Sequence, residues 1–108
     1  MATAKDLRRL ALALDGTAEA PHFDRTAFKV RRISATLAPD GRSANLMLTP
    51  GEQALKCTLT PEAFAPVPNA WGVRGATTVK LSAVTVAELR DALSLAWRRS
   101  LPKRPQRA

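Results

Sequence analysis

The chain has 108 residues, 45% hydrophobic and 24% charged, which is the composition of one ordinary globular domain. This composition excludes disordered, collagen-like and coiled-coil chains, and no apolar run approaches the roughly 20 residues of a membrane helix. A single cysteine excludes an internal disulfide bond. Because the first residues also lack a signal-peptide pattern, we expect a cytoplasmic protein.

The formal net charge is +8, from 17 basic and 9 acidic residues. Residues 98–108 hold five of the basic residues and no acid, so residues 1–97 carry 12 basic and 9 acidic residues, a net charge of +3. Pro102 and Pro105 prevent a helix from continuing there. We therefore divide the chain into a domain, residues 1–97, and a basic tail, residues 98–108. The tail is either a solvated end or an electrostatic arm for nucleic acid.

The first elements expected are a helix and a set of short strands. Thr3 is a suitable N-cap, and the residues that then recur at helical spacing before Asp15-Gly16 are Leu7, Leu10, Ala11 and Leu14. Residues 17–23 are a weaker strand candidate, and alternation predicts strands over 28–30 and 33–37. The apolar parity changes between the last two, which requires a turn or bulge at Arg31-Arg32.

The second half combines one further hairpin with two helices. Pro39-Asp40-Gly41 predicts a turn, followed by a strand over 44–49 and another over 77–81. Capping boxes at 49–52 and 85–88 predict a short helix to about residue 58 and a longer C-terminal one. The order α-β-β-β-β-α-β-α indicates an α+β domain whose antiparallel sheet carries its helices on one face.

Residues suited to catalysis or metal binding are few. His22 is the only histidine and Cys57 the only cysteine, and there is no Gly-rich phosphate loop, nucleophile elbow or acidic metal loop. We therefore predict that the protein is not an enzyme and needs neither a cofactor nor a metal. A reaction that uses His22 oriented by Asp24 is the last of the alternatives.

Basic residues cluster in the first two hairpins. We expect Lys29 and Arg31 on one strand face, Arg32 at the turn, and Arg42 just after the second turn. Basic hairpin tips of this kind can serve as wings that reach the phosphates of DNA. The structural alternative is a solvated sheet face whose charges prevent edge pairing.

Residues 66–81 contain two prolines, two glycines and Trp71, which indicates a shaped loop before a strand. In a functional interpretation, Trp71 stacks on a base while Arg74 and Lys80 meet phosphates. In a structural interpretation, Trp71 covers the edge of the core and the glycines permit close backbone approach. A protein- or small-molecule-binding groove at Trp71 and His22 is the main alternative to DNA binding.

Five segments in this order resemble the MmcQ/YjbR family over nearly the whole chain, up to Trp97: Ala20-Pro21-His22-Phe23-Asp24, 28–30, 33–37, Pro68-Asn69-Ala70-Trp71-Gly72 and 77–79. The resemblance implies a CyaY-like α+β fold and DNA binding through a double wing. The family often has glycine where this chain has Arg31-Arg32. Frataxin-like relatives of this fold bind iron through an acidic ridge, but the first helix here is largely basic, so we expect no iron site.

The sequence thus predicts a weakly sequence-specific DNA-binding protein that contacts the phosphate backbone. We expect DNA as its partner, no membrane or metal, and a monomer. The predicted contact residues are Lys29, Arg31, Arg32, Arg42, Trp71, Arg74 and Lys80.

Overall fold

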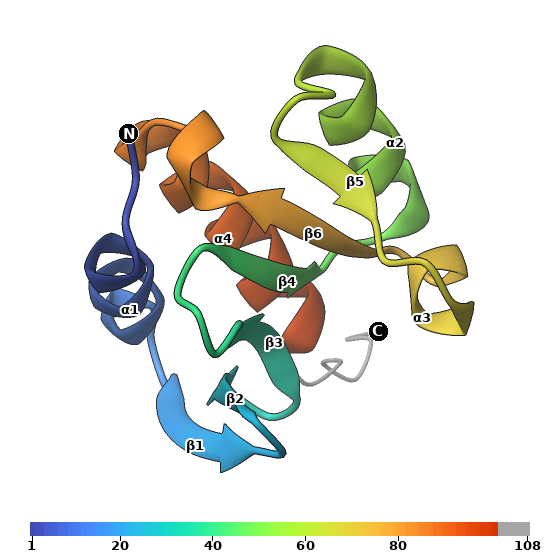
Figure 1. Cartoon of the computed structure of the whole chain (residues 1–108). Coiled ribbons are helices and arrows are strands. Elements are labelled where there is room, and N and C mark those ends of the chain that lie inside the picture. The colour runs from blue at the N-terminus through green and yellow to red at the C-terminus, as the bar shows by residue number, and fades with distance from the viewer. Residues whose placement is uncertain (102–108) are drawn as a thin grey trace, which may run out of the picture.

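The structure, a computed structural model, describes residues 1–101 (Figure 1), so most of the predicted tail lies outside the described residues. Its elements are α1 (Ala4–Ala13), β1 (Ala18–His22), β2 (Arg25–Lys29), β3 (Ile33–Leu37), β4 (Ser43–Met47), α2 (Pro50–Leu59), β5 (Phe64–Pro66), α3 (Ala70–Val73), β6 (Ala76–Lys80), η1 (Leu81–Ala83) and α4 (Val86–Ser100). Among these helices, none is long and apolar enough to cross a membrane.

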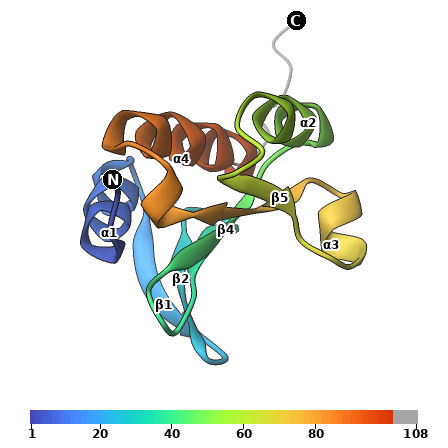
Figure 2. The same ribbon diagram turned by 45° about the horizontal axis from the view of Figure 1, so that its top comes forward.

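The strands form one antiparallel sheet in the order β1-β2-β3-β4-β6-β5. Helices α1, α4 and α2 lie over one face of this sheet, while the short α3 lies beside the end of β6 (Figure 2). No helix of residues 1–101 covers the opposite face. The predicted α+β class, with an antiparallel sheet and its helices on one face, is confirmed.

Alternation along the strands decides which face is covered. In β4, Ala44 and Leu46 are buried against the helices, whereas Ser43, Asn45 and Met47 point to the open face. The buried core joins strand residues to the apolar stripes of the helices; its largest members include Phe28, Leu46, Val79, Leu7, Leu89 and Leu93. The predicted stripes of α1 and α4 therefore form the inner surfaces of these helices.

Three of the helices begin with capping boxes, two of them expected from the sequence and the third at Thr3, which was expected only as an N-cap. In each, a threonine hydroxyl accepts a hydrogen bond from the third helical amide, and the acidic side chain there accepts one from the threonine amide. The pairs are Thr3 with Asp6, Thr49 with Glu52, and Thr85 with Glu88. Local signals alone were sufficient to place these helix starts.

The irregularity expected near Arg31-Arg32 is present, but it differs in detail. The register of β2 against β3 shifts between Phe28 and Lys29, and the chain then turns over residues 30–32. Arg31 therefore lies in the turn rather than on a strand face shared with Lys29, as the sequence analysis expected. Because of the bulge, β2 ends earlier than the apolar alternation indicates.

The last helix is longer than expected, since it continues through Arg98 and Arg99 to Ser100. The Ser100 hydroxyl is buried and donates to the carbonyl of Ala96 at 2.9 Å. Packing against β3 and β4 holds these three residues in the domain, so the tail begins beyond the boundary at residue 97.

Two short elements, β5 and α3, lie in the region expected to be irregular before β6. A strand of three residues and a helix of four show no usable periodicity, so they depend on tertiary contacts, among them pairing of β5 with β6 and packing of α3 beside it.

The Thr3 hydroxyl and amide, which donate hydrogen bonds to Asp6, hold the pKa of that carboxyl below its ordinary value. A carboxyl with a lowered folded-state pKa stabilises the fold above its unfolded-state pKa and loses this contribution as pH falls through the folded-state pKa. We expect Asp6→Asn to lower Tm at neutral pH, and the difference from wild type to shrink below about pH 4. Thermal unfolding followed by circular dichroism measures this. A difference that stays constant with pH would contradict the charged cap.

Candidate functional site

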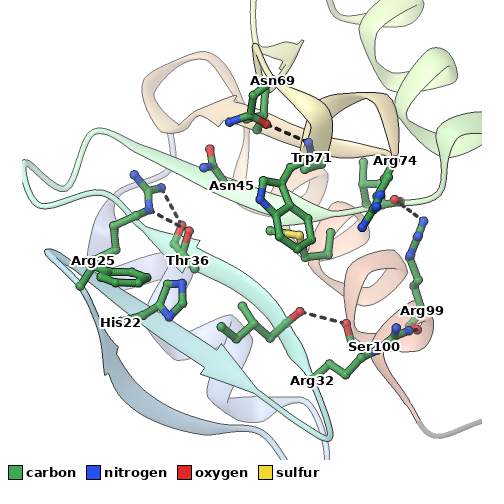
Figure 3. A pocket seen from close by; sticks show the side chains of 16 residues that line it. His22, Arg25, Arg32, Thr36, Asn45, Asn69, Trp71, Arg74, Arg99 and Ser100 are labelled. Atoms are coloured by element: carbon green, nitrogen blue, oxygen red, sulfur yellow. Dashed lines mark hydrogen bonds between the residues drawn. The ribbon is translucent and has the colours of Figure 1, made fainter.

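The open face of the sheet is hollowed between the β1–β2 turn and α3 (Figure 3). The hollow has a volume of about 610 Å³, which lies within the range of small-ligand sites. Its lining consists of His22, Phe23, Arg25, Arg32, Ile33, Thr36, Asn45, Met47, Leu48, Val67, Asn69, Trp71, Arg74, Ala76, Arg99 and Ser100. We call this the open-face hollow. It combines four arginines with aromatic and amide side chains, and none of these lining residues is acidic.

Three of the arginines are oriented by neutral oxygen atoms. Arg25 donates from Nε to Thr36 Oγ1 at 2.8 Å and from Nη2 to the Thr36 carbonyl at 3.2 Å. Arg32 donates to the carbonyl of Arg99 at 3.0 Å, and Arg99 in turn donates to the carbonyl of Leu48. Neutral acceptors restrict these side chains without cancelling their charge.

The ion pairs within residues 1–101 lie elsewhere in the fold. They join Arg8 to Glu19, Arg9 to Asp6 and Lys56 to Asp91. The four guanidinium groups of the open-face hollow therefore lack a carboxylate partner among the described residues. Uncompensated positive charge gathered in a concavity produces a field that attracts anions.

Trp71 stands at one wall of the hollow, on the one-turn helix α3 (Figure 3). The Asn69 side chain caps this helix by accepting from the Trp71 amide at 2.8 Å. The indole is 60% exposed, and the Arg74 guanidinium lies 5.6 Å from the centre of its ring. A ring so exposed does not cover the core edge, which was the structural interpretation of this residue; it presents a face to the hollow.

The backbone around α3 is packed too closely to admit side chains at two glycines. A Cβ at Gly72 would lie 1.7 Å from the carbonyl oxygen of Val67. Gly75 has φ +114°, and a Cβ there would lie 2.0 Å from the carbonyl oxygen of Leu48. The close backbone approach expected from the glycines is confirmed, and it fixes where Trp71 stands.

Gln53 of α2 adds a second constraint on the same segment. Its Nε2 donates to the carbonyl of Gly72 and to that of Ala76, each at 2.9 Å. One amide therefore ties α2 to both ends of the segment that carries Trp71 and Arg74. The sequence analysis gave Gln53 no role.

The floor of the hollow is a polar row across adjacent strands. Thr36 of β3 pairs with Asn45 of β4, which pairs with Thr78 of β6. The Thr78 hydroxyl donates to Asn45 Oδ1 at 2.8 Å. Because this contact uses the amide oxygen of Asn45, its NH₂ group is the part left to donate to a ligand.

The opposite wall is the two-residue turn between β1 and β2. His22 is partly buried and lines the hollow, and its ring meets Phe23 edge-on with 4.8 Å between ring centres. Asp24 is exposed and is not among the lining residues. The alternative groove at Trp71 and His22 therefore corresponds to a real cavity.

The structure distributes the seven predicted contact residues over three places. Arg32, Trp71 and Arg74 line the open-face hollow together. Arg42 and Lys80 line a separate hollow of about 440 Å³ beside the start of α1. The exposed residues Lys29 and Arg31 lie at the end of β2 and in the following turn, outside both. These residues therefore do not form the single wing surface expected from the sequence.

Sequence reasoning also missed members of the hollow. Arg25 was not among the predicted contacts, and Arg99 was assigned to the tail. Asn45 and Thr36 are ordinary polar residues of alternating strands, so only the strand order makes them neighbours. For Phe23, expected at the end of a candidate strand over 17–23, the signal in the sequence was its position beside the only histidine.

Cys57 is partly buried at the edge of the core, and this burial raises the pKa of its thiol. A raised pKa keeps the thiol protonated and unreactive at neutral pH. Within residues 1–101, no group of three or more histidine, cysteine or acidic residues is arranged to hold a metal ion.

No protein-family model and no curated protein matches the sequence. Among solved structures, the fold is similar to the crystal structure of *Deinococcus radiodurans* protein DR2400, described by a DUF419 family-model domain. The TM-score is 0.74 at 23% sequence identity, over 90% of this chain and 77% of that one. DUF419 is the YjbR/MmcQ-like family. The likeness therefore shows that the two chains share a fold.

We expect Gln53→Leu to lower stability by about 1–3 kcal/mol, because two partly buried side-chain hydrogen bonds are lost, although each carbonyl keeps a backbone donor. Loss of this tie also loosens α3, so Trp71 fluorescence should become more sensitive to acrylamide in a Trp97→Phe background. Chemical denaturation and quenching measure the two effects. Thr58→Ala, an exposed change on the same helix, is the control and should leave both unchanged. Equal quenching in the Gln53 and Thr58 variants would contradict the positioning role.

Proposed function

We propose that the protein binds nucleic acid through the open-face hollow, with phosphates at its arginines and a base against Trp71. The observation that carries this proposal is a set of four arginines, three of them oriented by neutral acceptors, with no acid in the same lining. Guanidinium groups match phosphate oxygens in geometry and charge, and an exposed indole is a stacking surface for any base.

The proposal retains DNA as a ligand, but its contact residues differ from those expected from the sequence. Arg32, Arg74 and Trp71 remain central, whereas Lys29 and Arg31, at the end of β2 and in the turn after it, lie outside the hollow. Arg42 and Lys80 belong to the second hollow, so they would meet only a longer ligand that continues past the first. Phosphates and stacking discriminate little between bases, which supports weak sequence preference.

We also infer that the chain is a member of the MmcQ/YjbR family, with a CyaY-like fold. Two observations support this inference: the ordered segments that resemble the family, and the fold shared with a DUF419 protein. The DNA-binding role associated with the family agrees with the charge of the hollow, which supports the proposal independently of the resemblance.

A second candidate is a small phosphorylated molecule held in the same hollow. The volume of about 610 Å³ suits a ligand of that size, and both Trp71 and His22 line it. This candidate shares the anion chemistry of the first. The two differ in whether a mononucleotide binds as tightly as an oligonucleotide.

We expect Arg32→Gln/Arg74→Gln to weaken oligonucleotide binding about tenfold or more, because each charge-assisted hydrogen bond to phosphate contributes appreciably. The slope of log K against log salt should fall by about one per residue. Fluorescence anisotropy at several salt concentrations measures both. The matched control is Lys5→Gln/Arg90→Gln, which removes the same charge from exposed positions of α1 and α4 and should retain most of the affinity.

Equal losses in the two double variants would show that net charge alone drives binding, and would contradict a site in the hollow. A third variant, Lys103→Gln/Arg104→Gln/Arg107→Gln, removes charge from the tail in the full chain. Binding that is lost only in this variant would assign the activity to the tail. A mononucleotide that competes with the oligonucleotide at equal concentration would favour the second candidate.

A further inference from the structure

Phe23 occupies an unusual position in this fold. His22 pairs with Arg25 across the hairpin, so Phe23 and Asp24 form a two-residue turn. Phe23 has φ +57° and is the only residue other than glycine with positive φ in the part of the chain that the structure describes. Glycine or asparagine is normally found at such a turn position, because a side chain with a Cβ is strained there.

The Phe23 ring gains little from burial in return for this strain. It is 94% exposed, more than any other large hydrophobic residue of the described chain. Neither core packing nor turn geometry therefore accounts for phenylalanine at this position. A strained backbone that presents an exposed apolar ring points to a contact with something outside the chain.

The location of the Phe23 ring indicates where this outside contact lies. Phe23 lines the open-face hollow from the β1–β2 turn, and Trp71 lines it from α3. Figure 3 shows His22 and Arg25 on one side of the hollow and Trp71 on the other. Two exposed aromatic rings, from elements far apart in the sequence, thus flank a cavity whose charged side chains are all arginines.

We propose that the ligand of the open-face hollow is a single-stranded nucleic acid, with unpaired bases stacked on Phe23 and Trp71. This inference rests on the proposed nucleic-acid binding. Bases in a duplex stack on one another, so their faces are not available to a protein ring without unstacking. Aromatic platforms beside a positively charged groove are the arrangement that binds single strands with little sequence preference.

The geometry of the open-face hollow favours single-stranded over double-stranded nucleic acid for two further reasons. A hollow of about 610 Å³ accepts a piece of ligand the size of a nucleotide, whereas a duplex would rest on its rim. Asn45 lines the hollow, and its NH₂ group is available to an acceptor on a base that enters it. The arginines around it are then placed for the phosphates that flank this base.

The decisive variant is Phe23→Asn, tested in the full chain. Asparagine tolerates the positive φ but has no ring, so Tm should equal or exceed that of wild type. Affinity for a fluorescent single-stranded mixed-sequence oligonucleotide of about 12 nucleotides should fall about tenfold, the loss of one stacked base. Such a loss without lower stability separates a binding role from a structural one.

Two substitutions of Trp71 separate the contribution of an aromatic ring from that of an apolar side chain. Trp71→Phe keeps an aromatic face and should retain most of the affinity, whereas Trp71→Leu should lose about tenfold. Leu59→Ala is the control for removal of an exposed apolar side chain, since Leu59 is 69% exposed on α2 and is not among the residues that line the hollow. It should bind as wild type does.

The same oligonucleotide annealed to its complement completes the test, and we expect it to bind at least tenfold more weakly than the single strand. Equal or tighter duplex binding that depends on Phe23 would overturn the inference in favour of a wedge inserted between base pairs. Binding that depends on Arg32 and Arg74 but not on the two rings would overturn the inference and leave the proposed function intact. Failure of both oligonucleotide forms to bind would overturn the proposed function itself.

Discussion

The constraint on which the structure depends is that one face of the sheet carries the buried core and must be covered by helices. Alternation in β4 sends Ala44 and Leu46 toward the helices, and β6 adds Val79 to the same side. Burial of this face against α1 and α4 supplies the hydrophobic free energy of the fold. The other face mixes threonine, asparagine and arginine with apolar side chains such as Ile33 and Met47, and no helix of residues 1–101 covers it. The open face is a consequence of how the core is built.

The arginines on this open face need no carboxylate partner, as they would in the core. A guanidinium deep in the core needs a carboxylate partner to offset its desolvation, whereas one at the wall of an open hollow can rely on water and a neutral acceptor. Arg25 and Arg99 are held in this manner by Thr36 and by the backbone of Leu48. The result is a set of oriented positive charges that remain available to a ligand.

The two walls of the hollow are built by different means. At α3, the close approach at Gly72 and Gly75 and the double hydrogen bond from Gln53 place Trp71 with little freedom. At the β1–β2 turn, the strained backbone of Phe23 is maintained by the hairpin pairing on either side of it. Local rules of turn chemistry are broken only at the second wall. A strained turn of this kind is expected at a ligand-binding site, because a sequence selected for stability alone would not contain it.

The sequence by itself determined the features that depend on near neighbours along the chain. The capping boxes begin α1, α2 and α4, the 39–41 turn is closed by a hydrogen bond from the Gly41 amide to the Ala38 carbonyl, and alternation marks the buried face. Each of these signals acts over a few residues, so it can be recognised without the fold. They were enough to predict an α+β domain with helices on one face.

Only the tertiary structure decided which residues share a surface. Arg99 reaches the hollow because α4 extends to Ser100 and packs on β3 and β4, which brings it to a carbonyl far away in sequence. Arg42, predicted in one cluster with Arg32, and Lys80, predicted as a phosphate contact with Arg74, lie at another hollow because β4 and β6 pair there. Strand order, twist and helix docking are properties of the whole chain, and no short pattern encodes them.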